Sequence, residues 1–479
     1  MRILLASSEV YPYSKTGGLA DSVGAFGKAL AKAGHDVGIV TPLHRGVQER
    51  FPEMKRVDWR FDLPLGSKRV DAELFSLDPA ERLRIYFVKK PVYFDRVGLY
   101  GENGADYQDN SERFIFFTKC VVHLARFLPW KAEVLHVHDW HTGVAPMMVS
   151  HQIGGDGWQT PPKVCLTIHN LAYQGVFPGN AFTLTNLPAE FFRPDGAEYY
   201  GQINCLKAGI AFADIVTTVS PRYAREITTA EYGAGLDGLL RKRQSALVGI
   251  LNGVDYDEWN TTTNSFLASS YSRADLSGKA VCKSELQREF GLKVDRRIPL
   301  FGVVTRLADQ KGIDISLGAL EEMLASDMQF VLLGSGAPGY EHAFKQLAGR
   351  FPSQVAVRIG YDQSLAHRIE SGCDFYLMPS RFEPCGLNQL YSLRYGTIPI
   401  VRRTGGLDDT VLDAVEDPLN ANGIKFTDCS AHGLAKAIRK ALILFQDEDM
   451  VRRYRRNGMA ANFSWSESVV RYTDAYNRR

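Results

Sequence analysis

The sequence predicts an α/β protein with two doubly wound domains, each a parallel sheet covered by helices. First, short apolar runs alternate with amphipathic segments along most of the chain, as in consecutive βα units. Second, 479 residues are enough for two domains that each bury a core. Third, the string TGGL occurs at 16–19 and again at 404–407, each time where a predicted strand gives way to a helix. Two such turns fit two domains that face each other across a cleft.

The first half shows the βα pattern with one interruption. Residues 57–90 alternate in short runs, typical of an antiparallel insertion at a sheet edge. Residues 91–109 are rich in Tyr, Gly, Asp and Asn, so we expect a long loop. The other predicted elements are strands over 3–6, 36–41, 134–138, 164–168 and 215–219, and helices over 18–33, 111–127, 203–213 and from Ser220-Pro221 onward.

The second half resumes the pattern after a break between 241 and 297, where a turn and a Ser/Thr-rich stretch occur. We therefore expect residues 1–245 to form the first domain and residues 246–459 the second. The last helix, within about 460–479, is expected to pack back on the first domain. Strands of the second domain are predicted over 300–304, 330–333, 355–359, 375–378 and 397–401.

Composition excludes several classes of protein. The net charge of +2 argues against nucleic acid as a partner, and we interpret the one basic run, at 452–456, as a solvated helix face. No apolar run approaches the roughly 18 residues of a membrane span, and the N-terminal run is too short for a signal peptide. The seven cysteines are widely spaced and form no C-x-x-C pair, which favours a reducing compartment without disulfides or a zinc site. We expect a cytoplasmic protein.

Two histidine-containing stretches end predicted strands of the first domain. The stretch 136–141 (HVHDWH) departs from the dinuclear pattern H-x-H-x-D-H and has no remote partner cluster, so we expect no metal. We place His136 in a packed strand and His138-Asp139 at its end, in the cleft. A lone histidine such as His169 is by default a packed one, but the Asn, Tyr and Gln that follow it favour a polar ligand site.

The second domain carries charged and glycine-rich strand ends. Arg306 and Lys311 suit a diphosphate, Arg through its planar fork and Lys as a point charge, with solvated surface charge as the alternative. The string 334–339 has the G-x-G-x-x-G form, but no acidic residue ends the next strand. We therefore interpret it as a nucleotide-facing turn and not as an NAD site. Glu383 is a carboxylate in the loop after strand 375–378, where polar substrates bind.

Six strings, in order, resemble the bacterial glycogen synthase and plant starch synthase family: 15–19, 138–140, 167–170, 306–312, 379–387 and 403–407. The resemblance covers nearly the whole chain. It implies the GT-B fold, with two Rossmann-like domains facing a central cleft, and a retaining glucosyltransferase. The donor would be ADP-glucose, and the acceptor would be the non-reducing end of glycogen or another α-1,4-glucan.

The resemblance also implies roles for individual residues of the first domain. Lys15, Gly17 and Gly18 would reach the donor, while His169 and Asp139 would flank its glucose.

In the second domain the resemblance implies that Arg306 and Lys311 neutralise the diphosphate, so that ADP leaves without a metal or other cofactor. Glu383 would hydrogen-bond the glucose hydroxyls, Tyr361 would stack on adenine, and Gly336 would lie at the donor. Three further donor contacts would be backbone amides: Cys385, Gly386 and Leu387. The residues expected to carry catalysis are His169, Glu383, Asp139, Arg306 and Lys311.

Retention by hydrolases uses paired carboxylates. Here the resemblance implies front-face attack instead, with the leaving phosphate as the base. Many related glycosyltransferases carry a second Glu where this chain has Tyr391, a feature shared with bacterial glycogen synthases, and Asn388 stands where Thr is common.

Three alternatives stay open. The donor could be UDP-glucose, or the product another α-glucoside. The chain could instead be a sugar-binding or regulatory protein on an inactive glycosyltransferase scaffold, although its intact motifs argue against this. Tyr93, Phe94, Tyr100 and Tyr107 could form a glucan platform or could simply pack.

Overall fold

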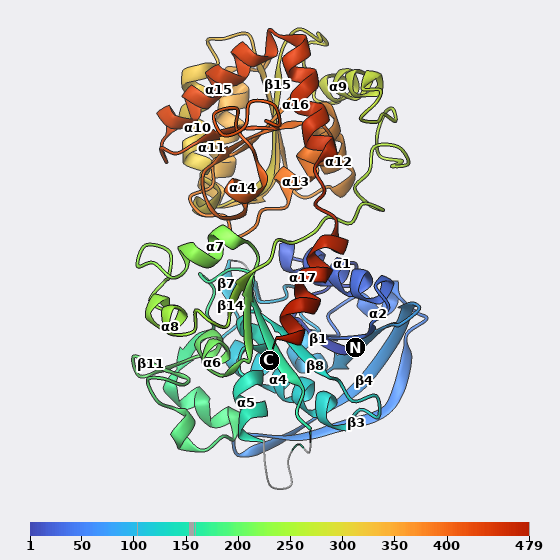
Figure 1. The fold of residues 1–479 in the computed structure, drawn as a ribbon, viewed down its shortest axis with the longest axis vertical. Helices are drawn as coiled ribbons and strands as arrows, with labels where there is room; N and C mark the ends of the chain where they lie inside the picture. The colour runs from blue at the N-terminus through green and yellow to red at the C-terminus, as the bar shows by residue number, and fades with distance from the viewer. Residues whose placement is uncertain (103, 153–157, 159, 479) are drawn as a thin grey trace. The chain divides into compact units, whose positions relative to one another are not determined.

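The computed structural model describes residues 1–102, 104–152, 158 and 160–478. It divides into two compact units (Figure 1). The first is Met1–Gly253 with the C-terminal segment that begins at Trp465, and the second is Val254–Ser464.

The first unit is built on a nine-stranded sheet of order β14-β13-β9-β8-β1-β2-β5-β4-β3. Strands β3 (Lys55–Leu65) and β4 (Lys68–Ala80) form an antiparallel edge insertion, as the sequence predicts. The remaining strands pair in parallel: β1 (Arg2–Ala6), β2 (Asp36–Pro42), β5 (Leu83–Lys89), β8 (Val134–His138), β9 (Lys163–Ile168), β13 (Ile215–Thr218) and β14 (Leu247–Gly249). The predicted insertion over 57–90 is too long, because its last run is β5, which pairs with β2 in parallel and with β4 in antiparallel.

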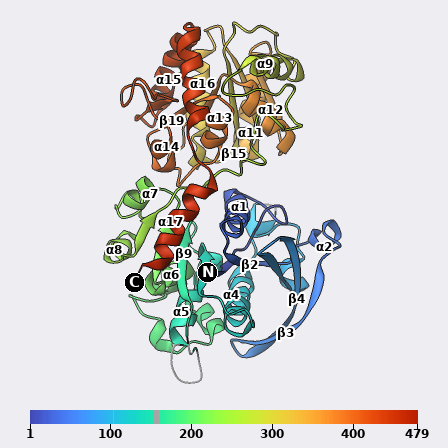
Figure 2. The same cartoon turned by 45° about the vertical axis from the view of Figure 1, so that its right-hand side comes forward.

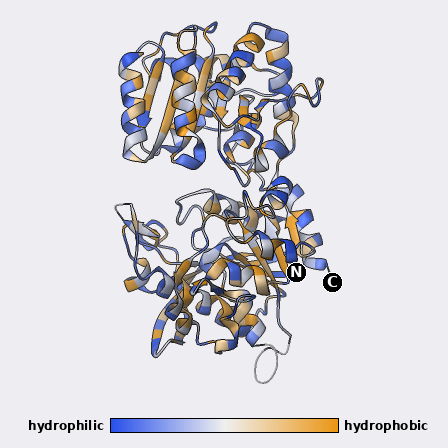
Figure 3. Cartoon of the chain, turned by 90° about the vertical axis from the view of Figure 1, so that its left-hand side faces the viewer, coloured by the Kyte–Doolittle hydropathy of each residue, from blue (hydrophilic) through white to orange (hydrophobic). Residues whose placement is uncertain are grey.

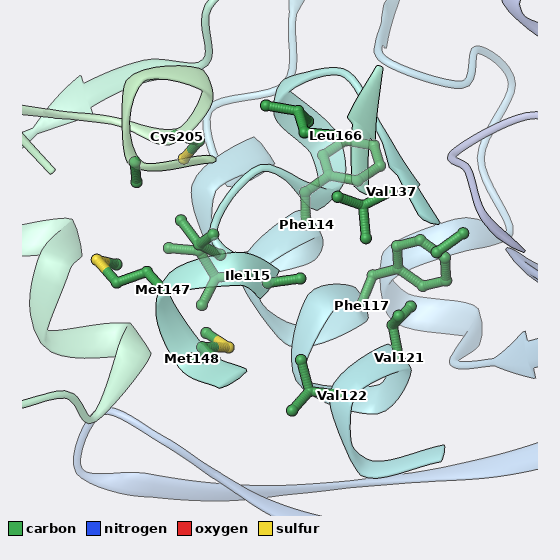
Figure 4. Close-up of a cluster of buried hydrophobic side chains, with 14 of the residues drawn as sticks. Phe114, Ile115, Phe117, Val121, Val122, Val137, Met147, Met148, Leu166 and Cys205 are labelled. Carbon is green, nitrogen blue, oxygen red and sulfur yellow. The ribbon is translucent and has the colours of Figure 1, made fainter. Parts of the chain in front are cut away.

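Helices cover both faces of this sheet because its central strands are apolar on both sides. In β1, Leu4 and Ala6 join one buried cluster while Ile3 and Leu5 join another. The first cluster lies under α4 (Asn110–Phe127), α5 (Ala145–His151) and α6 (Cys205–Phe212) (Figure 4). The second lies under α1 (Gly18–Lys32) and α17 (Trp465–Asn477), where Phe26 packs on Tyr472 with ring centroids 4.5 Å apart.

Smaller elements complete the first unit. The helices are α2 (Val47–Arg50), α3 (Pro91–Phe94), α7 (Pro221–Glu226) and α8 (Asp237–Lys242), with short 3-10 turns such as η1 (Trp140–Thr142). The short strands are β6 (Gly101–Glu102), β7 (Ala105–Asp106), β10 (Val176–Pro178), β11 (Glu198–Tyr199) and β12 (Gln202–Asn204). As predicted, Ser220 caps α7 by accepting from the Tyr223 amide, 2.9 Å away.

The second unit has a six-stranded, wholly parallel sheet of order β17-β16-β15-β18-β19-β20. Figures 1 and 2 show helices on both of its faces. In Figure 3 the strands are mainly hydrophobic and the helices are mixed, as expected for elements with one buried side. The strands are β15 (Leu300–Leu307), β16 (Gln329–Gly336), β17 (Val355–Ile359), β18 (Phe375–Met378), β19 (Ile398–Arg402) and β20 (Ile424–Phe426). The helices are α9 (Ser277–Glu289), α10 (Ile313–Met323), α11 (Pro338–Arg350), α12 (Gln363–Gly372), α13 (Asn388–Arg394), α14 (Gly405–Thr410), α15 (Ala431–Phe445) and α16 (Glu448–Ala460).

Several local predictions are wrong. The expected loop over 91–109 contains α3 and the β6–β7 hairpin. Tyr93 and Phe94 are buried in the first core, so they are packing residues and no glucan platform. The helix expected from 203 starts at Cys205, because β12 pairs up to Asn204 and the Asn204 side chain caps the helix.

The basic run at 452–456 is likewise not a purely solvated face. Arg455 reaches inward and pairs with the buried Asp374 at 2.6 Å. Among the described residues, no helix is both long enough and apolar enough to cross a membrane.

Candidate active site

Both sheets reverse their strand order at one point, and most of the predicted site residues follow the strands that flank it. In the first unit the order reverses between β1 and β8, and in the second between β15 and β18. Ligands of open α/β sheets bind beyond the carboxyl ends of the strands at such a switch point. Each unit is therefore described from its switch point outward.

In the first unit, the buried Glu9 fixes the loop that follows β1. Its Oε2 accepts from the Thr16 amide and from the Thr16 hydroxyl, the latter at 2.9 Å. Next to this contact, the Lys15 ammonium pairs with Asp21 at 2.8 Å. The loop therefore presents Lys15, Gly17 and Gly18 together at the start of α1, whose N-cap is Gly17.

Burial raises the pKa of Glu9 to about 7, although hydrogen bonds from Thr16 oppose the shift. Burial raises the pKa of Asp139 to about 7 as well, and the charge of Glu9 adds to that shift. Two carboxyl groups at this switch point thus resist ionisation more than exposed carboxyls do, and Glu9 is a member of the site that sequence reasoning missed. Its place directly after the first strand was the available signal.

Asp139 and His169 come together across the ends of β8 and β9. The Asp139 Oδ1 accepts from the His169 amide at 2.7 Å, and the Asp139 amide donates to the Thr167 carbonyl at 2.9 Å. Asp139 has φ 55° and ψ −171°, a conformation that normally requires glycine. A strained residue held by two specific hydrogen bonds is typical of a functional position.

His138, the last residue of β8, and His169, the first residue after β9, are both neutral. Burial lowers the pKa of His169 to about 3, and the pKa of His138 well below its usual value. His138 ends β8, as predicted, but its side chain is buried against His136 and His169 and does not face a ligand directly. His136 is fully buried in its strand, as predicted.

In the second unit, the loop after β15 meets the loop after β18. Lys311 and Glu383, 72 positions apart, form an ion pair of 2.6 Å. The Ser380 hydroxyl donates to the same carboxylate oxygen, Oε2, at 2.9 Å. Glu383 Oε1 has no partner among the described residues and is the oxygen left to accept from a ligand.

The remaining predicted residues follow neighbouring strands of the same sheet edge. Arg306 is the exposed residue near the end of β15, and its guanidinium bonds to no described residue. Gly334 and Gly336 lie inside β16, paired with Thr305 and Leu307. The prediction of a turn at these two glycines is therefore wrong; a Cβ at Gly336 would stand 2.4 Å from the Leu307 carbonyl, so they permit close strand pairing.

Tyr361 lies two residues after the end of β17, the edge strand next to β16, and its side chain is 67% exposed. An exposed aromatic ring on a strand end is a surface on which a planar base can stack.

The segment 385–388 lies between Glu383 and α13. Gly386 has φ +72°, which favours glycine, and the Gly386 and Leu387 amides donate to no described acceptor. The Cys385 side chain is buried. Asn388, whose role was open, donates to the Val304 carbonyl at 2.7 Å and so fixes the end of β15.

Tyr391 takes a packing position in α13. Its ring stacks on Trp259 with centroids 3.6 Å apart and an interplanar angle of 2°. Sequence reasoning missed Trp259, which lies in the irregular stretch after the first unit.

Metal ligands and disulfides add nothing to the site. Within the described parts of the chain, no group of three or more His, Cys, Asp or Glu side chains could hold a metal ion. All seven cysteines are free thiols.

Two Rossmann-like units with polar residues at their switch points define the GT-B class of glycosyltransferases. The family model for the starch synthase catalytic domain matches residues 2–242, and the model for group 1 glycosyl transferases matches residues 284–460. The chain belongs to the glycogen synthase and starch synthase family and is a glucosyltransferase.

Relatives match along the whole chain. The glycogen synthase of Anaeromyxobacter dehalogenans (strain 2CP-C) is 47% identical, with 99% of each chain covered. That of Opitutus terrae is 44% identical, again with 99% of each chain covered. Among solved structures, the catalytic domain of starch synthase IV from Arabidopsis thaliana, bound to ADP and acarbose, is 33% identical with a TM-score of 0.90, covering 100% of this chain and 98% of that one.

Proposed function

We propose that this protein transfers glucose from ADP-glucose to the non-reducing end of an α-1,4-glucan, with retention and with release of ADP. The second unit would hold the sugar nucleotide, and the first unit, with its C-terminal helix, would hold the acceptor and flank the donor glucose. The observation that carries the proposal is the arrangement of Lys311, Glu383 and Arg306 at one switch point.

The second unit offers charges of the kind a nucleotide sugar needs. Arg306 is exposed near the end of β15 and unpaired among the described residues, and Lys311 lies five positions on, in the short 3-10 turn that follows this strand. Cations of this kind stabilise the negative charge that develops on a departing diphosphate. Glu383 Oε1 would accept from a glucose hydroxyl, while Tyr361 would stack on adenine and the Cys385, Gly386 and Leu387 amides would donate to sugar or phosphate. Gly336 would let the nucleotide approach the sheet edge.

The first unit would complete the donor site. Lys15 would add a cation next to the phosphates. Gly17 and Gly18, which lack side chains, would let the phosphates approach the backbone closely. His169 and Asp139 would contact the glucose.

The proposed reaction replaces one bond at the anomeric carbon of glucose by another. The bond between the anomeric carbon and the β-phosphate oxygen breaks, and the acceptor hydroxyl oxygen bonds to the same face of that carbon. The hydroxyl proton passes to the leaving phosphate. Glu383 has Lys311 as its near partner and not a second carboxylate, which fits a mechanism without a glycosyl-enzyme intermediate.

The relatives support this reading, since those named above are glycogen synthases and the starch synthase structure was solved with ADP and acarbose. The test is to incubate the protein with glycogen and either ADP-glucose or UDP-glucose. We expect faster transfer from ADP-glucose, and new linkages that an α-1,4-specific exo-hydrolase removes. Faster turnover with UDP-glucose would overturn the donor assignment, and transfer from neither would favour a binding protein.

A further inference from the structure

A series of buried rings connects the C-terminal helix α17 to His169. The Tyr476 hydroxyl lies 2.7 Å from His136 Nδ1. The rings of His136 and His138 stack with centroids 4.3 Å apart and an interplanar angle of 25°. His138 Nδ1 lies 3.0 Å from His169 Nε2. All of these residues belong to the first unit.

Each of the two contacting histidines carries one ring proton. Burial lowers the pKa of His169 to about 3 and that of His138 well below its ordinary value, so both rings are neutral at pH 7. A neutral imidazole has one N–H donor and one bare acceptor nitrogen. In the contact between them, one ring must donate and the other must accept.

The surroundings of His138 decide which ring donates. Its Nε2 is buried and has no hydrogen-bond partner among the described residues. An N–H buried without an acceptor is rarer in proteins than an unsatisfied acceptor. The His138 proton therefore lies on Nδ1 and is donated to His169 Nε2. His169 Nε2 then accepts, and the proton of His169 lies on Nδ1.

We propose that His138 is a positioning residue that holds His169 as its Nδ1-protonated tautomer, with an N–H donor available to the ligand. His169 is only partly buried, and its Nδ1 has no partner among the described residues. An N–H there can donate to a hydroxyl or phosphate oxygen of the substrate, whereas the other tautomer would offer only a lone pair. The identification of the ligand as a sugar nucleotide rests on the proposed function. The assignment of the tautomer does not depend on it.

Helix α17 takes part in this arrangement through His136. Both nitrogens of the His136 ring are held: Nδ1 contacts the Tyr476 hydroxyl, and Nε2 lies 2.6 Å from the Thr167 hydroxyl. The rings of Tyr472 and Phe26 pack around the His136 ring, with centroids 5.5 and 5.7 Å from its centroid. The stack then fixes the plane of His138, and with it the direction of the Nδ1–H.

The tautomer can be measured directly on the full-length protein without substrate. Long-range nitrogen–proton NMR spectra of histidine-labelled protein distinguish protonated from bare ring nitrogens. The signals would be assigned by their loss in His169→Ala and His138→Asn. We expect Nδ1 to be protonated and Nε2 bare in both rings. A proton on His169 Nε2 would overturn the proposal and leave the proposed function standing. The expected tautomer in a protein without transferase activity would overturn only the function.

Activity of paired variants supplies a second test. His138→Asn keeps an N–H donor close to the position of Nδ1, and His138→Leu removes it. We expect the Leu variant to lose roughly 10- to 100-fold in kcat/KM for the donor, and the Asn variant to recover most of that loss. The matched control is His123→Leu, a histidine of α4 that packs on Trp59 and Phe127. Equal losses in the Asn and Leu variants, with native circular dichroism in both, would contradict a role for the donated proton.

Discussion

The two switch points of this chain are built with opposite chemistry. In the first unit, burial raises the pKa of Glu9 and Asp139 to about 7 and lowers that of His169 to about 3, so these three groups resist ionisation, and the ion pair of Lys15 with Asp21 is the exception at this switch point. In the second unit, Lys311 and Glu383 pair as ions at 2.6 Å, and Arg306 is exposed. Neutral hydrogen-bonding groups suit sugar hydroxyls, whereas fixed charges suit a diphosphate. The difference indicates a division of labour between the units.

Removing the charged carboxylate of the second unit should have the largest effect. We expect Glu383→Ala to reduce kcat by roughly 10²- to 10³-fold, since it removes the proposed acceptor for the glucose hydroxyls and the partner of Lys311. Steady-state transfer of labelled glucose to glycogen measures this. The matched control is Glu321→Ala, which breaks an exposed ion pair with Arg350 in the same unit. A Glu383→Ala variant as active as that control would refute the assigned role.

Removing the cation beside it should act mainly on the nucleotide. We expect Lys311→Ala to raise KM for ADP-glucose about 30- to 100-fold, because the proposed charge-assisted contact to phosphate would be lost. KM for glycogen should change much less. Lys345→Ala, on the exposed side of α11, serves as the control. If both KM values rose equally, the lysine would be supporting the fold and not the donor.

The suppressed ionisation of the first unit can be tested through stability. The folded-state pKa of Glu9, about 7, exceeds its ordinary value of 4.5, so the folded protein holds a proton that the unfolded chain releases between these pH values. Wild-type stability therefore falls as pH rises from about 4.5 to 7.

Glu9→Gln should lack this loss. Between pH 4 and pH 8 we expect the variant to gain about 3 kcal/mol in free energy of unfolding relative to wild type, which is about 1.4 kcal/mol for each pH unit between the two pKa values. Denaturant unfolding at both pH values measures the difference. Glu49→Gln, an exposed glutamate of α2, should show no such gain. If the Glu9 variant behaved like this control, the pKa of Glu9 in the folded protein would not be raised, and its ionisation would not lower the free energy of unfolding.

The smallest effect should come from Tyr391, at the position where related enzymes carry a second Glu. Because its ring stacks flat on Trp259, we interpret it as a packing residue. Tyr391→Phe keeps the stack and should change kcat and donor KM by less than about twofold. Tyr391→Ala removes the stack and should lower the melting temperature. A large kinetic loss in the Phe variant would instead give the hydroxyl a direct role at the donor.

Much of the fold was predictable from the sequence because the central strands of both sheets are short apolar runs, while polar and apolar residues alternate in the edge strand β3. The edge insertion of β3 and β4 and most of the parallel strands follow from periodicity, whereas β5 was assigned to the insertion and the three-residue strands β14 and β20 were missed. Tyr93 and Phe94 could not be placed in this way, since polar neighbours in the sequence hide their burial under α4. Gly336 was misplaced for a related reason: glycines mark turns and tight strand pairing equally well.

The candidate site was predictable as a set of strand-end motifs, but its internal contacts were not. Lys311 and Glu383 are far apart in sequence, and only the order of β15 and β18 in the sheet brings them together. The contact of His138 with His169 depends in the same way on the pairing of β8 with β9. Glu9 was missed because a single carboxylate next to serines carries no motif.

The division of labour can be tested most directly by calorimetric titration of ADP into wild type, Arg306→Ala, Lys311→Ala and His169→Ala. ADP lacks the glucose, so we predict that it binds the His169 variant as tightly as wild type. The Arg306 and Lys311 variants should each bind it at least about tenfold more weakly. Weakening by His169→Ala as large as that by Lys311→Ala would contradict the account.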